Sequence, residues 1–514
     1  MAASCSADPR TPLSDISLRD LYRLLDPVTV PAASPRASFI NWGLSYECTP
    51  LAVFEPETEH ECELVLELAR REGKTVRAAG VGHSPSDLAC TSGYMLRTEK
   101  LNKIIQVNTE KNYVLAQGGV TLNALHAALS EHNLAMINVG SISDQTLAGV
   151  VTTATHGTGV HFKVISTHVL SLTLLLADGS RVRCSREEHS DLFLASLCGL
   201  GSTGLILQIQ LEVGPAFRLE ETQVSVPFRD VVQALDAYAN AAEHVRLWWF
   251  PQADVVRVSS ADRTNEPKNP VGTFLWHSFI GFHLVQFLFF LGRYIQSLNP
   301  WICRLSAWLD RGKTTTVDDS WRVFNVDCKY PQFTTEWAIP YEKTSACLLE
   351  LRNWLEEEHA DPQGLRPHFP IEIRFSDGDD IWLSPSYSQR TTWIGIIQYK
   401  YVNSGKPELF VLVTHADEMT RLAFFYRPYG FNVPYRKLFE RFEHILARHD
   451  GRPHWAKSHP LRSADLRRLY PRFDNFIHVL HTVDPNGIFR NEYIERHLFD
   501  KPYDERVFKR IQSS

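Results

Sequence analysis

The sequence predicts an α+β protein built from two parts behind an N-terminal extension. The chain has 514 residues, and at roughly 100–200 residues per domain it is long enough for about two to four domains. Strand-like and helix-like patterns alternate as far as residue 213, and beyond Pro215 the composition shifts towards Trp, Phe and Tyr. We therefore expect an extension at 1–40, a first unit at 41–214 and a second α+β unit at 215–514.

Local patterns predict the elements of the first unit. Residues 1–40 carry five prolines and predict an extended lead-in around one short helix near 18–25. Leu64, Val65 and Leu68 share one face of a helix expected at 57–72, which Gly73 ends. A second helix is expected at 122–132, and Asp178-Gly179 supplies a hairpin turn. Strands are expected at 51–54, 75–79, 113–117, 168–177, 181–184 and 205–211.

Composition excludes several classes of protein. Hydrophobic residues make up 44% of the chain and charged residues 22%, which is the usual globular range. With 53 Lys and Arg against 59 Asp and Glu, the net charge is −6. A chain without basic excess is a poor candidate for nucleic-acid binding. Binding of a small, neutral or acidic ligand remains compatible with this composition.

The cysteines and the N-terminal residues indicate the cellular compartment in which the protein is expected. The nine cysteines are odd in number and include no CxxC pair, so neither a disulfide framework nor a cysteine-based zinc site is predicted, and a reducing compartment is favoured. Residues 1–25 contain Asp8, Asp15 and Asp20 and no unbroken apolar run, which argues against a secretory signal.

An apolar segment interrupts the second unit. The 24 residues 269–292 contain no Asp, Glu, Lys or Arg and are long enough to cross hydrocarbon, which takes about 20 residues. Pro270, His277, His283 and Gln286 oppose a spanning helix, because lipid offers them no partners. An interfacial membrane helix and a buried helix of the second unit both remain open.

Two glycine-containing segments suggest a binding site for a large polar cofactor. The first, 80–85, reads Gly-Val-Gly-His-Ser-Pro after an expected strand. Its backbone N–H groups could approach a pyrophosphate, but Pro85 stands where a dinucleotide fingerprint has its third glycine, so a structural turn is the alternative. The second, 140–159, is dense in Gly, Ser and Thr, whose donors could face one groove. His156 invites a metal, yet no partner follows at ligand spacing, so no metal site is predicted.

Ordered motifs over residues 41–493 resemble a known family. R-A-A-G-V-G-H-S-P-S at 77–86, G-S-I-S with A-G-V-V-T-T-A-T-H-G-T-G at 140–159, and G-L-G-S-T-G at 199–204 resemble the flavin-binding (PCMH-type) domain of the vanillyl-alcohol oxidase superfamily. E-I-R at 372–374, H-W-A-K at 454–457 and D-P-N-G-I-F at 484–489 resemble the sugar-1,4-lactone oxidases, the fungal D-arabinono-1,4-lactone oxidases above all, with the animal L-gulono-1,4-lactone oxidases as near relatives. We assign 484–489 a structural turn.

The resemblance implies an FAD-binding first unit and a substrate-binding cap. It implies that His83 carries FAD covalently through the 8α-methyl group, which should raise the flavin potential. A free surface histidine is the alternative. The other cofactor-binding residues that it implies are Gly80, Val81, Gly82, Ser84, Pro85, Gly140, Ser141, Ser143, Thr146, Gly149, Thr153, Thr155, His156, Gly157 and Gly204.

Gly140 bears on the electron acceptor. Related plant dehydrogenases resemble this stretch but carry alanine there, where the methyl group shields the flavin from dioxygen. Glycine leaves that path open, which implies an oxidase. The alternative is that Gly140 only permits a turn with positive φ.

Three residues are expected to carry the chemistry. Glu372 and Arg374 alternate with apolar residues along an expected strand, so both face one side, either a pocket or solvent. The resemblance implies that Glu372 contacts lactone hydroxyls, that Arg374 stabilises developing negative charge, and that Lys457 lies near flavin and substrate. His454 is expected to orient its loop by hydrogen bonding.

The expected reaction is FAD-dependent oxidation of the C2 hydroxyl of D-arabinono-1,4-lactone or a related aldono-1,4-lactone. Dioxygen accepts the electrons and gives hydrogen peroxide, and the 2-keto product tautomerises to an ascorbate-type enediol. The alternatives are an L-gulono- or L-galactono-1,4-lactone oxidase, a dehydrogenase that passes electrons to cytochrome c, and a membrane-attached binding protein without turnover. By resemblance, the outer mitochondrial membrane or another intracellular membrane is the expected location, with 269–292 as the contact.

Overall fold

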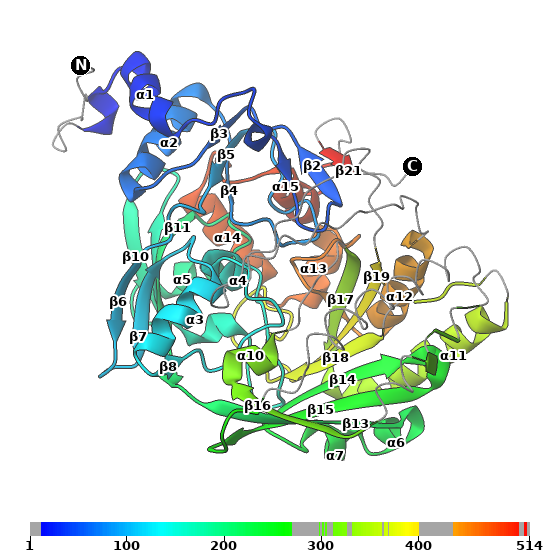
Figure 1. The fold of residues 1–514 in the computed structure, drawn as a ribbon. Coiled ribbons are helices and arrows are strands. Elements are labelled where there is room, and N and C mark those ends of the chain that lie inside the picture. Colours follow the sequence, from blue (N-terminus) through cyan, green and yellow to red (C-terminus); the bar gives the residue numbers. More distant parts are fainter. Residues whose placement is uncertain are drawn as a thin grey trace.

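The computed structural model describes residues 12–269, 298, 301–302, 304–305, 312–325, 332–361, 364–367, 370–399, 435–502 and 508–510. Helices and both parallel and antiparallel sheets are mixed in it (Figure 1), so the predicted α+β class is confirmed. A small parallel sheet and a five-stranded antiparallel sheet form the N-terminal half, and an eight-stranded antiparallel sheet dominates the second half.

The N-terminal part is built on a three-stranded parallel sheet. Helix α1 (Leu18–Leu25) packs on α2 (Glu59–Glu72). Thr58 and Glu61 form a capping box at the start of α2, and Gly73 ends it with φ +61°. The strands in sheet order are β3 (Ala52–Phe54), β5 (Tyr94–Arg97) and β4 (Val76–Ala79).

A five-stranded antiparallel sheet follows, with the hairpin predicted from Asp178-Gly179 at one edge. Gly179 has φ +89°, which suits glycine in a tight turn. The strands in sheet order are β10 (Arg181–Ser185), β9 (Val169–Leu175), β11 (Leu205–Glu212), β7 (Tyr113–Gln117) and β6 (Ile104–Asn108). The helices of this part are α3 (Leu122–Glu131), α4 (Leu147–Thr152) and α5 (Ser190–Ser196). A two-stranded sheet joins β8 (Leu134–Ala135) to β12 (Gly214–Pro215).

The large antiparallel sheet lies at the lower right of Figure 1. Its strands in order are β16 (Thr314–Asp319), β13 (Arg218–Pro227), β15 (Val255–Thr264), β14 (His244–Phe250), β18 (Ile371–Ser376), β19 (Thr391–Tyr399), β17 (Gln332–Pro340) and β20 (Arg452–Pro453). The helices of this half are α6 (Phe228–Gln233), α7 (Leu235–Ala239), α10 (Ser320–Phe324), α11 (Thr344–Ala360) and α12 (Arg436–Arg448).

The two faces of this sheet have different partners. On β18, Ile371, Ile373 and Phe375 share a hydrophobic cluster with residues of α6, α11 and α12. Because side chains alternate along a strand, Glu372 and Arg374 lie on the opposite face. That face meets the N-terminal half, since Trp393 of β19 and Ala338 of β17 belong to the same cluster as the core of the five-stranded sheet. The charged pair of β18 therefore lies between the two halves.

The C-terminal helices return to the N-terminal half. Helices α13 (Ser463–Leu469), α14 (Phe473–Val483) and α15 (Glu492–Leu498) lie beside it in Figure 1. Arg496 forms a buried bidentate pair with Asp87, at 2.7 and 2.9 Å. The strand β21 (Phe508–Arg510) pairs with β2 (Tyr46–Cys48), which also pairs with β1 (Phe39–Ile40). The unit boundary at 214/215 stays a prediction.

The predicted turn at 484–489 is present. The carboxylate of Asp484 accepts hydrogen bonds from the backbone N–H groups of Ile488 and Phe489, and Gly487 has φ +70°. The carbonyl of Ile488 accepts from Val76 N of β4 at 2.7 Å, so the turn joins the C-terminal segment to the parallel sheet.

Two further expectations concern the membrane and the cysteines. Among the described residues, no helix has the length and apolar character needed to cross a membrane. Residues 270–292 of the apolar segment lie outside the described part, so the interfacial and the buried interpretation of that segment both stay open. The described cysteines Cys48, Cys62, Cys90, Cys184, Cys198 and Cys347 are buried free thiols.

Candidate active site

His83 lies in a tight loop directly after β4. Gly82 has φ +74°, and its carbonyl accepts from Trp42 N at 2.9 Å. The imidazole of His83 stacks on Trp42, with ring centroids 5.0 Å apart and planes inclined by 22°. Nδ1 of His83 is buried and finds no hydrogen-bond partner among the described residues. Burial lowers the pKa of His83 to about 4, so the ring is neutral at pH 7 and keeps a nitrogen lone pair for a ligand.

The second glycine-containing segment packs against this loop. A Cβ atom on Gly80 would lie 2.3 Å from Oγ1 of Thr146, so the two segments touch where glycine is required. Gly157 abuts Asn138 in the same way, with a Cβ position 2.2 Å from Oδ1. Gly140 does not have a positive φ, so the alternative explanation of this glycine as a turn residue is wrong. The glycine at 140 is better explained by close neighbours, because a Cβ atom there would lie 3.2 Å from His156 O and from Thr155 Cγ2.

Several predicted cofactor residues bond to the protein itself. Ser143 donates from Oγ to Asn325 Oδ1 at 2.7 Å. Thr153 donates to the carbonyl of Gly149 at 2.8 Å, and Gly204, with φ +145°, packs against the carbonyl of Leu175. The carbonyls of Ser84 and Pro85 accept hydrogen bonds from Asn41 and Ser458, respectively, and Val81 lies between Gly80 and Gly82 in the His83 loop. These contacts are compatible with shaping the loops, and the predicted contacts to a cofactor stay predictions.

The charges of β18 lie in a buried site rather than in solvent. Arg374 is only 7% exposed. Its Nη1 donates to Ser141 Oγ at 3.3 Å, and its Nε lies 3.6 Å from Glu372 Oε1. Arg246 of β14 approaches the same carboxylate oxygen at 3.5 Å. The structure thus brings Glu372 and Arg374 together with the segment that contains Gly140 and Ser141.

A buried carboxylate that the sequence analysis missed completes the cluster. Glu336 of β17 accepts from Arg374 Nη2 at 2.5 Å through Oε1. Its Oε2 lies 4.0 Å from Nζ of Lys457. Burial opposes ionisation of Glu336, but the positive charges of Arg374 and Lys457 hold its pKa well below the usual range. Glu336 is therefore an ionised carboxylate between two cations.

Two neutral histidines border the carboxylate. His156 Nδ1 donates to the carbonyl of Gly157 at 2.9 Å, which leaves Nε2 to accept from Arg374 at 3.4 Å. Its ring stacks on Trp393 at 3.7 Å. Burial lowers the pKa of His156 to about 4. His454 Nδ1 accepts from Ala456 N at 3.1 Å, which is the loop-orienting hydrogen bond expected of it.

His156, Glu336 and His454 also have the geometry of a metal site. Their ligand atoms lie within 4.8 Å of one another, although the sequence shows no ligand spacing because the three residues are far apart in the chain. The guanidinium of Arg374 already bonds Glu336 and His156, and its positive charge would repel a metal cation. The cluster is better explained as an arginine site.

The loop that carries Lys457 is tied to the loop that carries His83. Lys457 N donates to the carbonyl of His454 at 2.8 Å. The adjacent Ser458 bonds Tyr46 OH at 2.8 Å and donates to the carbonyl of Pro85 at 3.4 Å. His83 and Lys457 therefore belong to neighbouring loops of one site.

A signal for Glu336 was present in the sequence. It is the one charged residue between Phe333 and Ile339, in a run that reads as an apolar strand. A charge inside such a strand needs a buried partner. Trp42 stacks on His83 and Trp393 stacks on His156. Neither tryptophan has a comparable signal in the sequence, because only the tertiary structure brings it to the site.

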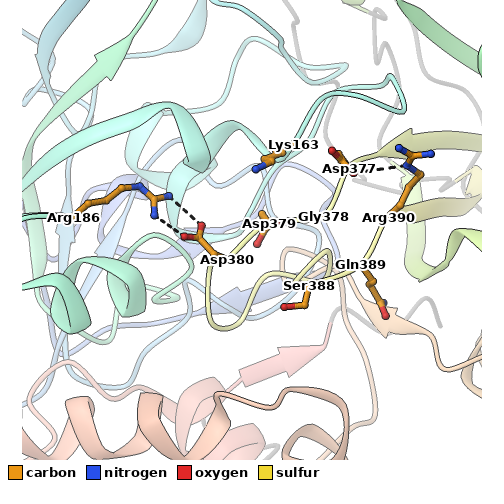
Figure 2. A pocket seen from close by; sticks show the side chains of 9 residues that line it. All are labelled: Lys163, Arg186, Asp377, Gly378, Asp379, Asp380, Ser388, Gln389 and Arg390. Carbon is orange, nitrogen blue, oxygen red and sulfur yellow. Dashed lines mark hydrogen bonds and ion pairs between the residues drawn. The ribbon is translucent and has the colours of Figure 1, made fainter.

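A separate cavity of about 610 Å³ lies at the seam between the two halves (Figure 2). Its lining side chains include Lys163 and Arg186 of the N-terminal half and residues 377–380 and 388–390 after β18. Arg186 and Asp380 face each other across it and form a bidentate pair at 2.6 and 3.0 Å. No predicted site residue lines this cavity, and the ion pair makes it a contact between the halves.

The residues around His83 fit FAD. The imidazole offers an unused buried nitrogen, and Nδ2 of Asn138 is likewise buried without a partner in the described part of the chain. Gly80, Gly140 and Gly157 stand where Cβ atoms would crowd neighbours. These glycines let the two segments pack closely against each other, and glycine-containing backbone of this kind offers N–H groups that can bind the phosphates of a dinucleotide.

Comparisons with known proteins first define the class. A family model described as an FAD binding domain matches residues 50–185. The crystal structure of cholesterol oxidase from B. sterolicum has the same fold, with a TM-score of 0.72 over 92% of this chain and 99% of that chain, at 14% identity. The chain therefore contains an FAD-binding domain and shares the overall fold of this cholesterol oxidase.

The family follows from the second match. A model described as D-arabinono-1,4-lactone oxidase matches residues 209–416 and 421–497. The L-gulonolactone oxidase of Scyliorhinus torazame is 37% identical over 462 residues, which are 90% of this chain and 98% of that protein. A putative D-arabinono-1,4-lactone oxidase of Neurospora crassa is 30% identical over 499 residues, or 91% and 87% of the two chains. The chain belongs to the D-arabinono-1,4-lactone oxidase family, which confirms the resemblance drawn from its motifs.

Proposed function

We propose that the protein oxidises the C2 hydroxyl of D-arabinono-1,4-lactone, or of a related aldono-1,4-lactone, with dioxygen. The products are the 2-keto lactone and hydrogen peroxide, so the two hydrogens leave the substrate and enter O₂. The observation that carries this proposal is a group of three charges, in which Glu372 and the buried Arg374 lie on the sheet face that meets the loops of His83 and Gly140, and the half-buried Lys457 joins them from the loop after β20.

The chain positions the substrate and stabilises its charge. Bound FAD would supply the hydride acceptor and the route of electrons to dioxygen. Glu372 has carboxylate oxygens to accept from lactone hydroxyls. Arg374 is held rigidly by Ser141 and Glu336, so its charge needs no reorganisation when negative charge develops nearby. Lys457 is a second cation beside the same carboxylate.

Oxygen and peroxide measurements test this function. Purified protein in air is given D-arabinono-1,4-lactone, and oxygen uptake and peroxide are followed together. One peroxide per oxygen consumed is the expected result. Lactone oxidation that proceeds only with cytochrome c would identify a dehydrogenase instead, and a colourless protein without turnover would indicate the binding protein.

A covalent bond between His83 and FAD is the second part of the proposal. It is supported by the neutral ring and by the unused, buried Nδ1. After acid precipitation, the yellow colour should stay with the wild-type polypeptide and move to the supernatant in His83→Ala. Colour that leaves the wild-type polypeptide on precipitation would mean non-covalent binding.

L-gulono-1,4-lactone is the second candidate substrate. It is favoured by the higher identity to the Scyliorhinus L-gulonolactone oxidase, 37% against 30% for the Neurospora protein. One CH₂OH group is worth about 1–3 kcal/mol in discrimination, or roughly 10–200-fold. The ratio of kcat/KM for the D-arabinono-, L-gulono- and L-galactono-lactones decides between them.

Membrane association through 269–292 is proposed on sequence alone. The segment lacks ionisable acids and bases other than histidine and is long enough for an interfacial or spanning helix. Localisation to the outer mitochondrial membrane or another intracellular membrane is expected. A variant without residues 270–291 should be released by carbonate where the full chain stays in the membrane pellet.

A further inference from the structure

The strand register brings Glu336 and Arg374 together across one glycine. In the order β18-β19-β17, Gly395 of β19 lies opposite Glu372 of β18 on one side and Glu336 of β17 on the other. All three positions share one face of the sheet, because directly paired residues point the same way. A side chain at 395 would stand between the two flanking strands. A Cβ there would lie 3.5 Å from Cγ of Glu336, so glycine leaves space beside the carboxylate that accepts from Arg374.

The two oxygens of Glu336 have different partners. Oε1 accepts from Arg374 at 2.5 Å and lies 3.4 Å from His156 Nε2. Oε2 faces Lys457 Nζ at 4.0 Å. The side chain of Glu336 is 6% exposed, so water does not substitute for these contacts. One carboxylate therefore fixes the two cations to which the proposed function assigns roles.

Stability alone does not account for this arrangement. Removing two charges from water is costly, and buried ion pairs can often be replaced by apolar residues without loss of stability. A carboxylate in an otherwise apolar strand serves better as a fixed acceptor for a guanidinium than as a packing group. The stacked ring of His156 blocks another side of the guanidinium and restricts it further.

We propose that Glu336 is a positioning residue that acts through Arg374. It holds the Arg374 guanidinium at a fixed place and orientation above the loop of Gly140 and Ser141, while its second oxygen orients Lys457. The inference rests on the proposed function, because it assumes that Arg374 stabilises charge that develops during lactone oxidation.

A double-mutant cycle on turnover tests the proposal. Glu336→Gln should lower kcat by about 10–100-fold, since a displaced transition-state donor forfeits much of the roughly 10²–10³-fold effect that such a donor supplies. KM for the lactone should stay within about threefold, because uniform binding is not removed. Glu336→Asp, which keeps the charge on a shorter side chain, should recover part of the rate.

The decisive comparison is made in an Arg374→Ala background. There, Glu336→Gln should cause a much smaller fold-loss of kcat than in the wild type, because Arg374 is gone and only the contact with Lys457 remains for Glu336 to act through. An equal fold-loss in both backgrounds would overturn the proposal, since that result means a general structural role. Glu67→Gln is the matched control. Glu67 is a mostly buried carboxylate bonded to Arg70 and Arg71 on α2, away from the site, and its variant should keep the wild-type kcat.

A double-mutant cycle on the melting temperature tests the coupling of Glu336 and Arg374 without measuring enzyme activity. Arg374→Ala leaves the Glu336 charge buried with fewer partners and should lower Tm, and Glu336→Gln added to it should restore part of the loss. Additive changes in Tm would show that the two residues are not coupled and would overturn the proposal. If the wild-type protein does not oxidise lactones but the Tm changes are coupled, the proposed function fails while the pairing stands.

Discussion

A methyl group at position 140 would have two close neighbours. The Cβ of Gly140→Ala would lie 3.2 Å from His156 O and Thr155 Cγ2, so these neighbours must yield by only a few tenths of an ångström and the variant should fold. Under the proposed function, the methyl group narrows the path of dioxygen. We expect oxygen-dependent reoxidation to fall about tenfold or more, which is about 1.4 kcal/mol of barrier. Lactone oxidation with cytochrome c as acceptor should be retained. Stopped-flow reoxidation checks this, and an unchanged oxygen rate would contradict it.

Gly80 tests the contact between the two cofactor loops. In Gly80→Ala, the new Cβ would lie 2.3 Å from Thr146 Oγ1 and 2.9 Å from its Cγ2, so the loops must separate. Overpacking of this kind costs about 1–3 kcal/mol, and we expect lower Tm and lower flavin content. Adding Thr146→Ala removes both atoms and should recover most of the loss. Failure of this second substitution to restore flavin content would show that the contact is not the cause.

Site residues were predictable where a local pattern exists. The alternation at 371–375 placed Glu372 and Arg374 on one face, and the burial of Arg374 decides for a pocket over solvent. The contacts of Glu336 depend on the register between β17 and β19, and the stacking of Trp393 on His156 depends on a distant loop that packs against β19. A sequence pattern reports which face a residue takes, but it does not report which distant residue lies opposite.

The elements of the N-terminal half were predictable for a similar reason. The helix expected at 57–72 is α2, Glu59–Glu72, and the strand expected at 113–117 is β7 at the same residues. Their periodicity and their Gly and Thr boundary residues are local signals. The eight-stranded sheet was not predicted as such, because it pairs β14 with β18, which lies more than a hundred residues further along the chain. Pairing over that separation leaves no local signature.

The loop after β18 contains an acid whose ionisation should weaken the fold. Burial raises the pKa of Asp379 to about 7, against 3.8 for the free side chain. The folded state then binds more protons than the unfolded state between about pH 4 and 7, so stability falls as pH rises through this window. Asp379→Asn, which can still bond Ile381 and Ser384, should remove this loss. Above pH 7, the substitution should raise the free energy of unfolding by about 4 kcal/mol at most.

Melting temperature as a function of pH checks the prediction for Asp379. Wild type and Asp379→Asn should differ little near pH 4 and diverge towards pH 8. The neighbouring Asp380→Asn, which loses an exposed ion pair with Arg186, serves as the control and should cost about 0–1 kcal/mol. Parallel curves for wild type and Asp379→Asn would mean that Asp379 is ionised throughout.

Over the whole molecule, the C-terminal segment closes the fold on its beginning. Two contacts join residues about four hundred positions apart. One is the buried ion pair of Asp87 and Arg496, and the other is the hydrogen bond from Val76 N to the carbonyl of Ile488. The segment also carries Lys457, and Ser458 fastens it to the His83 loop. The site is therefore complete only when both ends of the chain have come together, which explains why its geometry could not be derived from either half alone.

Several buried histidines should make the whole fold sensitive to acid. Burial lowers the pKa of His126 and His156 to about 4 and that of His497 to about 3, against 6.5 for the free ring. Between about pH 4 and 6.5 the unfolded chain binds more protons than the folded one. The stability is therefore fully present above pH 6.5 and is lost as pH falls through this window. Each such ring contributes up to about 1.4 kcal/mol per pH unit.

Substitution of a single ring tests this whole-molecule dependence. His126 stacks on Trp321 and bonds Ser143, and burial alone accounts for its lowered pKa. His126→Gln cannot take up a proton, so its Tm should fall less steeply than that of wild type from pH 6.5 to 4.5. Proton uptake on unfolding near pH 5.5 should be smaller by about one. The exposed His444→Gln on α12 should keep the wild-type slope. Identical slopes in all three proteins would contradict the prediction, because they would mean that the folded protein binds a proton at His126 as readily as the unfolded chain does.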